Sequence, residues 1–109
     1  MLLDVRTYRC KPGTIAAHLS LYEKHGKTPQ FRCLGEPLCY LKTETGNPNE
    51  YMHIWVYENA GDREAKRAVL WADEDWLAYT RKSAELGALT SQTNKLMTPV
   101  KFCPLAAKS

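Results

Sequence analysis

Residues 34–57 read LGEPLCYLKTETGNPNEYMHIWVY, and this stretch decides the fold. The turn-forming run GNPN at residues 46–49 separates two apolar segments, which predicts an antiparallel hairpin of residues 38–44 and 51–57. Successive side chains of a strand point to opposite faces, so the second strand has two different surfaces. One is formed by His53, Trp55 and Tyr57 and the other by Met52, Ile54 and Val56. Such a strand predicts a sheet between its own helices and a second layer, either a ligand or another subunit.

The residues before the hairpin predict a strand and a helix. Alternation over residues 2–10 indicates a first strand, which ends at Lys-Pro-Gly. Helical spacing over residues 14–25 predicts a helix that Thr14 caps and Gly26 ends.

The second strand is expected to begin near residue 31 and to be interrupted at residues 35–37. Pro37 has no N–H to donate and Gly35 tolerates unusual φ values, so together they predict a bend or bulge. Glu36 then lies either at the edge of a pocket or dimer, or in solvent.

The residues after the hairpin predict two helices and a last strand. A helix opens at residues 59–62, and its expected buried stripe is Ala65, Ala68, Val69 and either Trp71 or Ala72. Asp73 caps a second helix that ends at Gly87, and residues 90–97 form the last strand before a tail from about residue 100. The order β-α-β-β-α-α-β predicts an α+β, ferredoxin-like fold: a four-stranded antiparallel sheet with helices on one face.

Composition limits the class of protein. The 109 residues, 44% hydrophobic and 25% charged, are expected to form one domain spanning residues 1–109. The net charge of +3 is spread without long basic runs, so we expect no nucleic-acid partner. The chain shows neither a signal peptide nor an apolar run long enough to span a membrane, so we expect no membrane partner. The four cysteines lack CxxC spacing and are expected to be reduced thiols in a cytoplasmic protein, although a short-range Cys33–Cys39 pair stays open.

Candidate site residues come from the aromatic strand and its neighbours. His53 is either a base or hydrogen-bond donor at the centre of its strand, or a core histidine bonded to a carboxylate such as Asp4. Arg6 is expected to pair with Asp4 or Glu44, and its face with Tyr8 is either an anion site or a dimer interface. Trp71 and Trp76 either anchor helices to the sheet or line a pocket beneath them.

Metal and cofactor chemistry find little support. His18, Tyr22 and His25 share a helix side, but no ligand motif accompanies them, so we expect no metal ion. The sequence contains no P-loop, GxGxxG or GxSxG motif, and we expect no cofactor.

Four motifs together resemble the NIPSNAP family: VRTYRCKPG, LGEPLCYLKTETG, HIWVYENAGDREAKRAVL and the DEDW step. The resemblance covers about residues 2–98, and the matching positions are Arg6, Thr7, Tyr8, Gly35, Glu36, Pro37, His53, Trp55, Tyr57, Arg63 and Glu64. It implies a subunit that pairs through its sheet into a dimeric α/β barrel. It also implies kinship with a superfamily that includes cofactor-free monooxygenases and heme-degrading enzymes. The family provides no settled catalytic residues.

Three functions follow as expectations. The first is a homodimer, paired through the sheet face of Arg6, Tyr8, His53, Trp55 and Tyr57, that binds a small molecule between sheet and helices. Its candidate ligand-binding residues are Arg6, Tyr8, Tyr22, His53, Trp55 and Trp76. The alternatives are a small cofactor-independent monooxygenase-like enzyme, with His53 and Tyr22 as catalytic candidates, and a protein-interaction scaffold.

Overall fold

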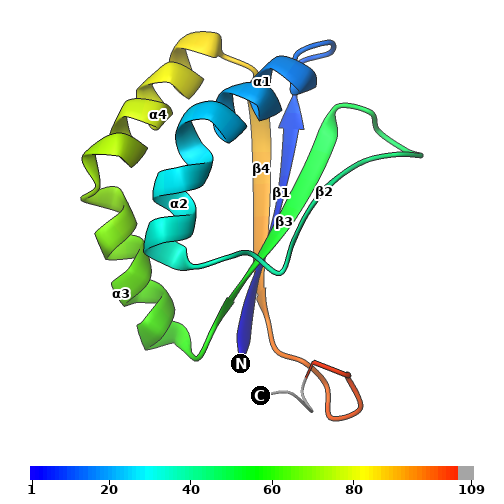
Figure 1. Ribbon diagram of the computed structural model, residues 1–109. Helices are drawn as coiled ribbons and strands as arrows, with labels where there is room; N and C mark the ends of the chain where they lie inside the picture. Colours follow the sequence, from blue (N-terminus) through cyan, green and yellow to red (C-terminus); the bar gives the residue numbers. More distant parts are fainter. Residues whose placement is uncertain (106–109) are drawn as a thin grey trace.

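The computed structural model describes residues 1–105, which fold into one antiparallel sheet covered on one face by helices (Figure 1). The strands are β1 (Leu2–Cys10), β2 (Cys39–Lys42), β3 (Glu50–Tyr57) and β4 (Leu89–Met97), in the spatial order β2-β3-β1-β4. The helices are α1 (Ile15–Leu21), the π-helical turn η1 (Tyr22–Gly26), α2 (Lys27–Leu34), α3 (Ala60–Trp71) and α4 (Glu74–Leu86). The predicted ferredoxin-like α+β fold is therefore confirmed. The last four residues of the predicted tail lie outside the described residues.

The hairpin and the helix ends confirm the local sequence rules. β2 and β3 pair antiparallel, with Tyr40 opposite His53. The side chains of Asn59 and Asp73 accept hydrogen bonds from the backbone N–H groups of Asp62 and Trp76 at the starts of α3 and α4. α4 ends at Gly87, which has the left-handed conformation that glycine adopts without strain.

The prediction that the first helix stops at Gly26 is wrong. The helix continues through η1 into α2, so residues 31–34 are helical and not part of a strand. Gly26 is required for close packing: a Cβ there would lie 2.8 Å from Cδ1 of Tyr22 and 3.0 Å from Cγ of Tyr79. The helix ends instead at Gly35, whose φ is +84°. Residues 35–38 are thus a helix-to-strand loop and not a bulge, and Glu36 is exposed.

The alternation of β3 is confirmed, but the sheet face expected to pair with a second subunit, that of Arg6, Tyr8, His53, Trp55 and Tyr57, is the face that the protein's own helices cover. The side chains of Tyr51, His53, Trp55 and Tyr57 are buried beneath the protein's own helices. Met52, Ile54 and Val56 lie half-buried on the opposite, open face of the sheet. The large rings are needed on the helix side, because they fill the space up to the aromatic side chains of the helices. The resulting core cluster consists of Tyr22, Leu34, Trp55, Tyr57, Leu70, Trp76 and Tyr79.

The predicted buried stripe of α3 is also wrong. Ala65, Ala68, Val69, Trp71 and Ala72 are exposed, and Leu70 is the buried residue of this helix. α3 instead turns Arg63, Arg67 and Leu70 inward, which share one face at i, i+4 and i+7. The reason is electrostatic, because the sheet beneath α3 presents the carboxylate of Asp4.

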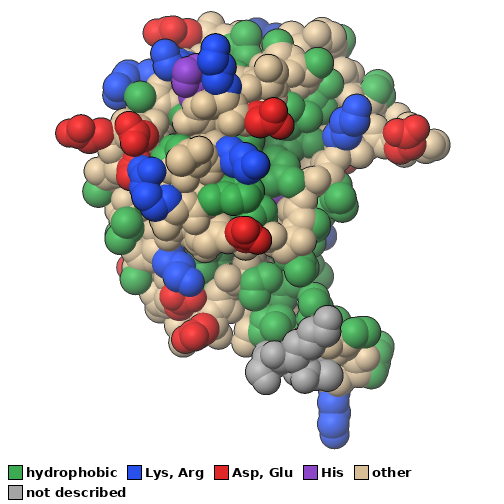
Figure 2. Space-filling view, in the orientation of Figure 1, with side chains coloured by type: hydrophobic (Ala, Val, Ile, Leu, Met, Phe, Trp, Pro, Cys, Tyr) green, Lys and Arg blue, Asp and Glu red, His purple; other side chains and the backbone are tan. Residues whose placement is uncertain are grey.

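The surface over the helices carries charges of both signs, interspersed on the face that Figure 2 shows. No helix within residues 1–105 is both long and apolar enough to cross a membrane.

Candidate functional site

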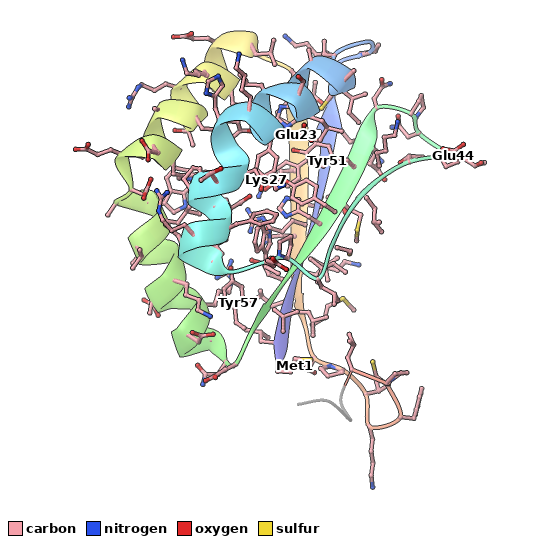
Figure 3. The ribbon with its side chains drawn as sticks, viewed as in Figure 1. Met1, Glu23, Lys27, Glu44, Tyr51 and Tyr57 are labelled. Carbon is pink, nitrogen blue, oxygen red and sulfur yellow. The ribbon has the colours of Figure 1, made fainter. Side chains whose placement is uncertain are left out.

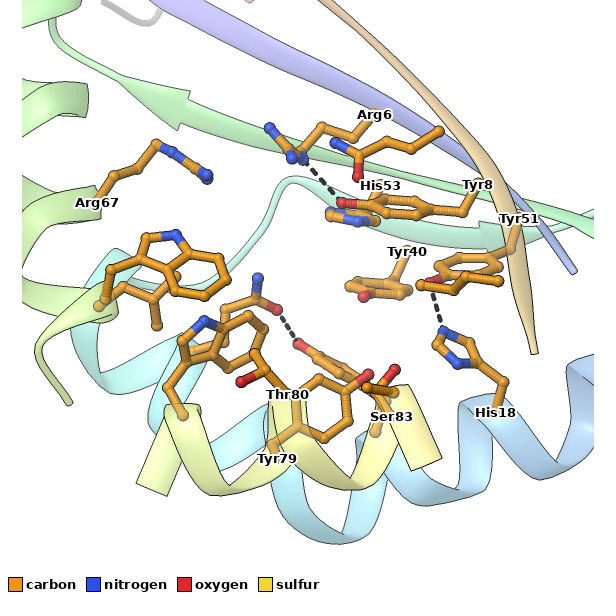
Figure 4. Close-up of a pocket in the computed structure, with 18 of the residues that line it drawn as sticks. Arg6, Tyr8, His18, Tyr40, Tyr51, His53, Arg67, Tyr79, Thr80 and Ser83 are labelled. Carbon is orange, nitrogen blue, oxygen red and sulfur yellow. Dashed lines mark hydrogen bonds between the residues drawn. The ribbon is translucent and has the colours of Figure 1, made fainter. Parts of the chain in front are cut away.

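A pocket of about 400 Å³ lies between the helix-facing side of the sheet and the helices (Figure 4). The sheet contributes Arg6, Tyr8, Tyr40, Tyr51, His53, Leu89 and Gln92. The helices contribute His18, Tyr22, Gln30, Arg67, Leu70, Trp71, Trp76, Tyr79, Thr80, Ser83 and Ala84. Its volume is in the range of small-molecule sites, and its walls are largely aromatic with a few convergent polar groups.

Parallel rings form the sheet side of the pocket. The His53 ring stacks on Tyr40 at 4.5 Å and 3°, and on Tyr8 at 5.2 Å and 8°. Tyr51 stacks on Tyr8 at 5.2 Å and 9°. The register explains this stacking, because Tyr40 lies opposite His53 and Tyr8 lies opposite Tyr51 on neighbouring strands. At these separations the rings overlap face to face, so each covers its neighbour's face and the pocket meets their edges.

His53 is a neutral member of this surface. Burial and then the positive charge of Arg6 lower its pKa to about 3. Its Nδ1 accepts a hydrogen bond from Nε1 of Trp55 at 2.5 Å, so the proton of the neutral ring is on Nε2. The expected carboxylate partner, Asp4, is not its partner, because Asp4 is bonded to two arginines. His53 is thus a weak base and a hydrogen-bond donor.

The phenol and imidazole groups at the helix side are held by short hydrogen bonds. Nε2 of His18 lies 2.6 Å from the hydroxyl of Tyr51, which Figure 3 shows pointing from the sheet toward the helices. The hydroxyl of Tyr22 donates to Oε1 of Gln30 at 2.5 Å. Burial raises the pKa of Tyr79 to about 12 and raises that of Tyr22 as well, so both phenols stay protonated at neutral pH.

One end of the pocket is positively charged. Arg6 donates from Nε to the hydroxyl of Tyr8 at 3.0 Å and from Nη1 to Oδ2 of Asp4 at 3.2 Å. The predicted Arg6–Asp4 pair is therefore confirmed, whereas Glu44 lies at the tip of the hairpin (Figure 3). Nε of Arg63 donates to the same Asp4 oxygen at 3.0 Å. Arg67 points into the pocket from α3 (Figure 4).

Five of the candidate ligand-binding residues, Arg6, Tyr8, Tyr22, His53 and Trp76, line the pocket. Trp55 is not among the lining residues; it is 1% exposed and packs edge-on against Phe31 in the core. Sequence reasoning missed Tyr40 and Arg67. Tyr40 could have been found from the hairpin register, which puts it opposite His53. Arg67 could have been found from its helical spacing to Leu70, which puts both residues on one face of the helix.

Within residues 1–105, no group of three or more His, Cys, Asp or Glu side chains is arranged to hold a metal ion. All four cysteines are free thiols, with Cys33 at the end of α2 and Cys39 at the start of β2.

The chain is similar to several solved structures, although no curated protein matches it. A NIPSNAP family protein of unknown function from Agrobacterium tumefaciens is 40% identical, with a TM-score of 0.88, over 96% of this chain and 93% of that one. An uncharacterised NIPSNAP domain protein from Burkholderia xenovorans is 28% identical, with a TM-score of 0.88, over 95% and 99% of the two chains. An antibiotic biosynthesis monooxygenase is 20% identical, with a TM-score of 0.63, over 92% and 99%, which shows a shared fold. The NIPSNAP family model matches residues 3–104, and on this evidence the chain belongs to the NIPSNAP family.

Proposed function

We propose that this NIPSNAP family chain binds a small molecule in the pocket between its sheet and its helices, and that it does so as a homodimer. The pocket itself is the observation that supports binding. It combines a volume of about 400 Å³ with stacked rings and a few fixed polar groups. Ordered aromatic walls with convergent donors are what a site needs to orient a small ligand.

The test of binding is to fill the pocket. Ser83 lines the pocket from α4, and Ser83→Phe places a ring in it; Ser20→Phe makes the same change on the exposed side of α1. Native mass spectrometry of protein purified without added ligand should show a small molecule on the wild type and on Ser20→Phe, and none on Ser83→Phe. Binding in this pocket would be contradicted if all three proteins carried the molecule equally. It would also be contradicted if the wild type were empty and no member of a metabolite library stabilised it.

The open face of the sheet supports the homodimer. All helices lie on the other side (Figure 1), and the open face of the two central strands carries the half-buried side chains of Val5, Thr7, Met52, Ile54 and Val56. Leu41 and Met97, which are 54% and 50% exposed, extend this apolar surface. One-sided antiparallel sheets usually turn a polar face to water, so an aliphatic face calls for a cover. A second copy brings the same self-complementary surface.

The test of assembly is a charge on that face. Ile54→Lys would bury an unpaired ammonium in the interface and should give a monomer in sedimentation velocity at micromolar concentration. Val69→Lys is the matched control, because Val69 is 59% exposed on α3, and it should sediment like the wild type. A monomeric wild type, or an Ile54→Lys variant that remains a dimer, would refute the proposal.

The titratable groups of the pocket favour binding over catalysis. The pKa of His53 is about 3, and the pKa values of the buried phenols are raised, so none of these groups titrates near neutral pH as a general base or acid should. The likeness to a monooxygenase is a likeness of fold.

A further inference from the structure

The charges around the pocket do not balance. Asp4 is fully buried, and its Oδ2 accepts hydrogen bonds from Arg6 and Arg63. Arg67 reaches the same region, and among residues 1–105 it has neither an ion pair nor a side-chain hydrogen bond. The structure therefore gathers three guanidinium groups around one carboxylate.

Among residues 1–105, no other group of the pocket offsets this excess of positive charge. His53 is neutral, and Tyr57 beside the cluster remains protonated, because burial and then the charge of Asp4 raise its pKa. Burial, together with the positive charges of Arg6 and Arg63, lowers the pKa of Arg67. Like charges in a partly desolvated site repel one another strongly, and a bound anion would relieve that repulsion.

The rest of the pocket fits a flat ring. The stacked rings of Tyr8, His53 and Tyr40 form one wall, and Tyr79 faces them from α4 (Figure 4). Trp76 also lines the pocket, with its ring 5.1 Å from that of Tyr79. The edges of stacked rings pack on the face of an aromatic ligand in the edge-to-face arrangement. One water molecule occupies about 30 Å³ in the liquid, so a pocket of about 400 Å³ has room for roughly a dozen non-hydrogen atoms.

Resting on the proposed binding function, we infer that the ligand is a planar aromatic carboxylate. Its carboxylate lies between Arg67 and Arg6, since guanidinium groups bind carboxylates through paired, charge-assisted hydrogen bonds. Its ring system packs against the edges of the stacked rings of Tyr8, His53 and Tyr40. Arg67 is then the residue that selects an acid, because Arg6 is already engaged by Asp4 and Tyr8.

Three matched probes of the same ring system test this inference: 2-naphthoate, 2-naphthamide and 2-naphthylmethylamine. By calorimetry, 2-naphthoate should bind at least roughly tenfold more tightly than the amide, and the amine should bind weakest, because a charged hydrogen bond contributes at least that much. Arg67→Gln should abolish the preference for the acid. Arg81→Gln removes the same charge from an exposed position of α4 and should leave the preference unchanged.

Each other outcome overturns the inference. Equal binding of acid and amide would leave pocket binding intact while refuting selection of an anion. A preference that survives in Arg67→Gln would refute the role of Arg67. Failure of 2-naphthoate to bind would also refute the inference. The proposed function is tested separately, by whether Ser83→Phe loses the molecule that co-purifies with the wild type.

Discussion

Replacing Asp4 by Asn should destabilise the protein strongly, because Asp4 is the counter-ion of the buried arginine cluster. Asn keeps the shape of the side chain, so the change removes charge without opening a cavity. Asp4 is 0% exposed, and its Oδ2 lies 3.2 Å from Arg6 and 3.0 Å from Arg63. Breaking a buried ion pair by removing one partner costs about 3–5 kcal/mol. The Arg63 side chain keeps 23% of its exposure, so water recovers part of its solvation, and we expect a loss of about 3 kcal/mol.

Urea unfolding at pH 7 and a single protein concentration measures this loss, since assembly makes stability depend on concentration. Asp75→Asn is the control, because the Asp75 side chain is 74% exposed and its ion pair with Arg32 is long, at 3.5 Å; it should lose far less stability. Adding Arg63→Gln to Asp4→Asn removes one of the cations left without a counter-ion and should restore part of the lost stability. An Asp4→Asn variant as stable as Asp75→Asn, or a double variant less stable than Asp4→Asn, would refute the reasoning.

Two further predictions concern His53 and Gly26. The pKa of His53 is lowered to about 3, so below pH 6.5 the unfolded chain binds a proton that the native protein does not, and stability falls as the pH falls. His53→Asn should remove about 1.4 kcal/mol per pH unit from the slope of unfolding free energy between pH 6 and 4, and parallel slopes for variant and wild type would contradict this. Gly26→Ala places a Cβ 2.8 Å from Cδ1 of Tyr22 and should cost about 1–3 kcal/mol in the same assay. Gly61→Ala lies in the exposed first turn of α3, where the Cβ would meet only Oδ1 of Asn59 at 3.3 Å, so it should cost far less; equal losses for both glycines would rule out crowding as the cause.

Short-range chemistry was sufficient to predict most elements of the fold. The hairpin follows from alternation on either side of GNPN, and the starts of α3 and α4 follow from Asn59 and Asp73, whose side chains satisfy backbone N–H groups within the same turn. Each of these interactions is made within a few residues along the chain, so its evidence is contained in the local sequence. The NIPSNAP resemblance rested on the same kind of ordered local motifs.

Most of the errors concern contacts between distant segments. Alternation separates Trp55 from Ile54 but is symmetric, so the face that the helices cover depends on the rings that α4 and η1 bring to it. Gly26 carries the same local signal as a helix end, and only the rings of Tyr22 and Tyr79 show that it marks a close approach. Arg67 shares the inward face of α3 with Arg63, which pairs with Asp4 from a strand 59 positions earlier. Spacing along the chain therefore determines which elements form and which side chains share a face, whereas the surface that each face meets depends on packing and charge between segments that are far apart in sequence.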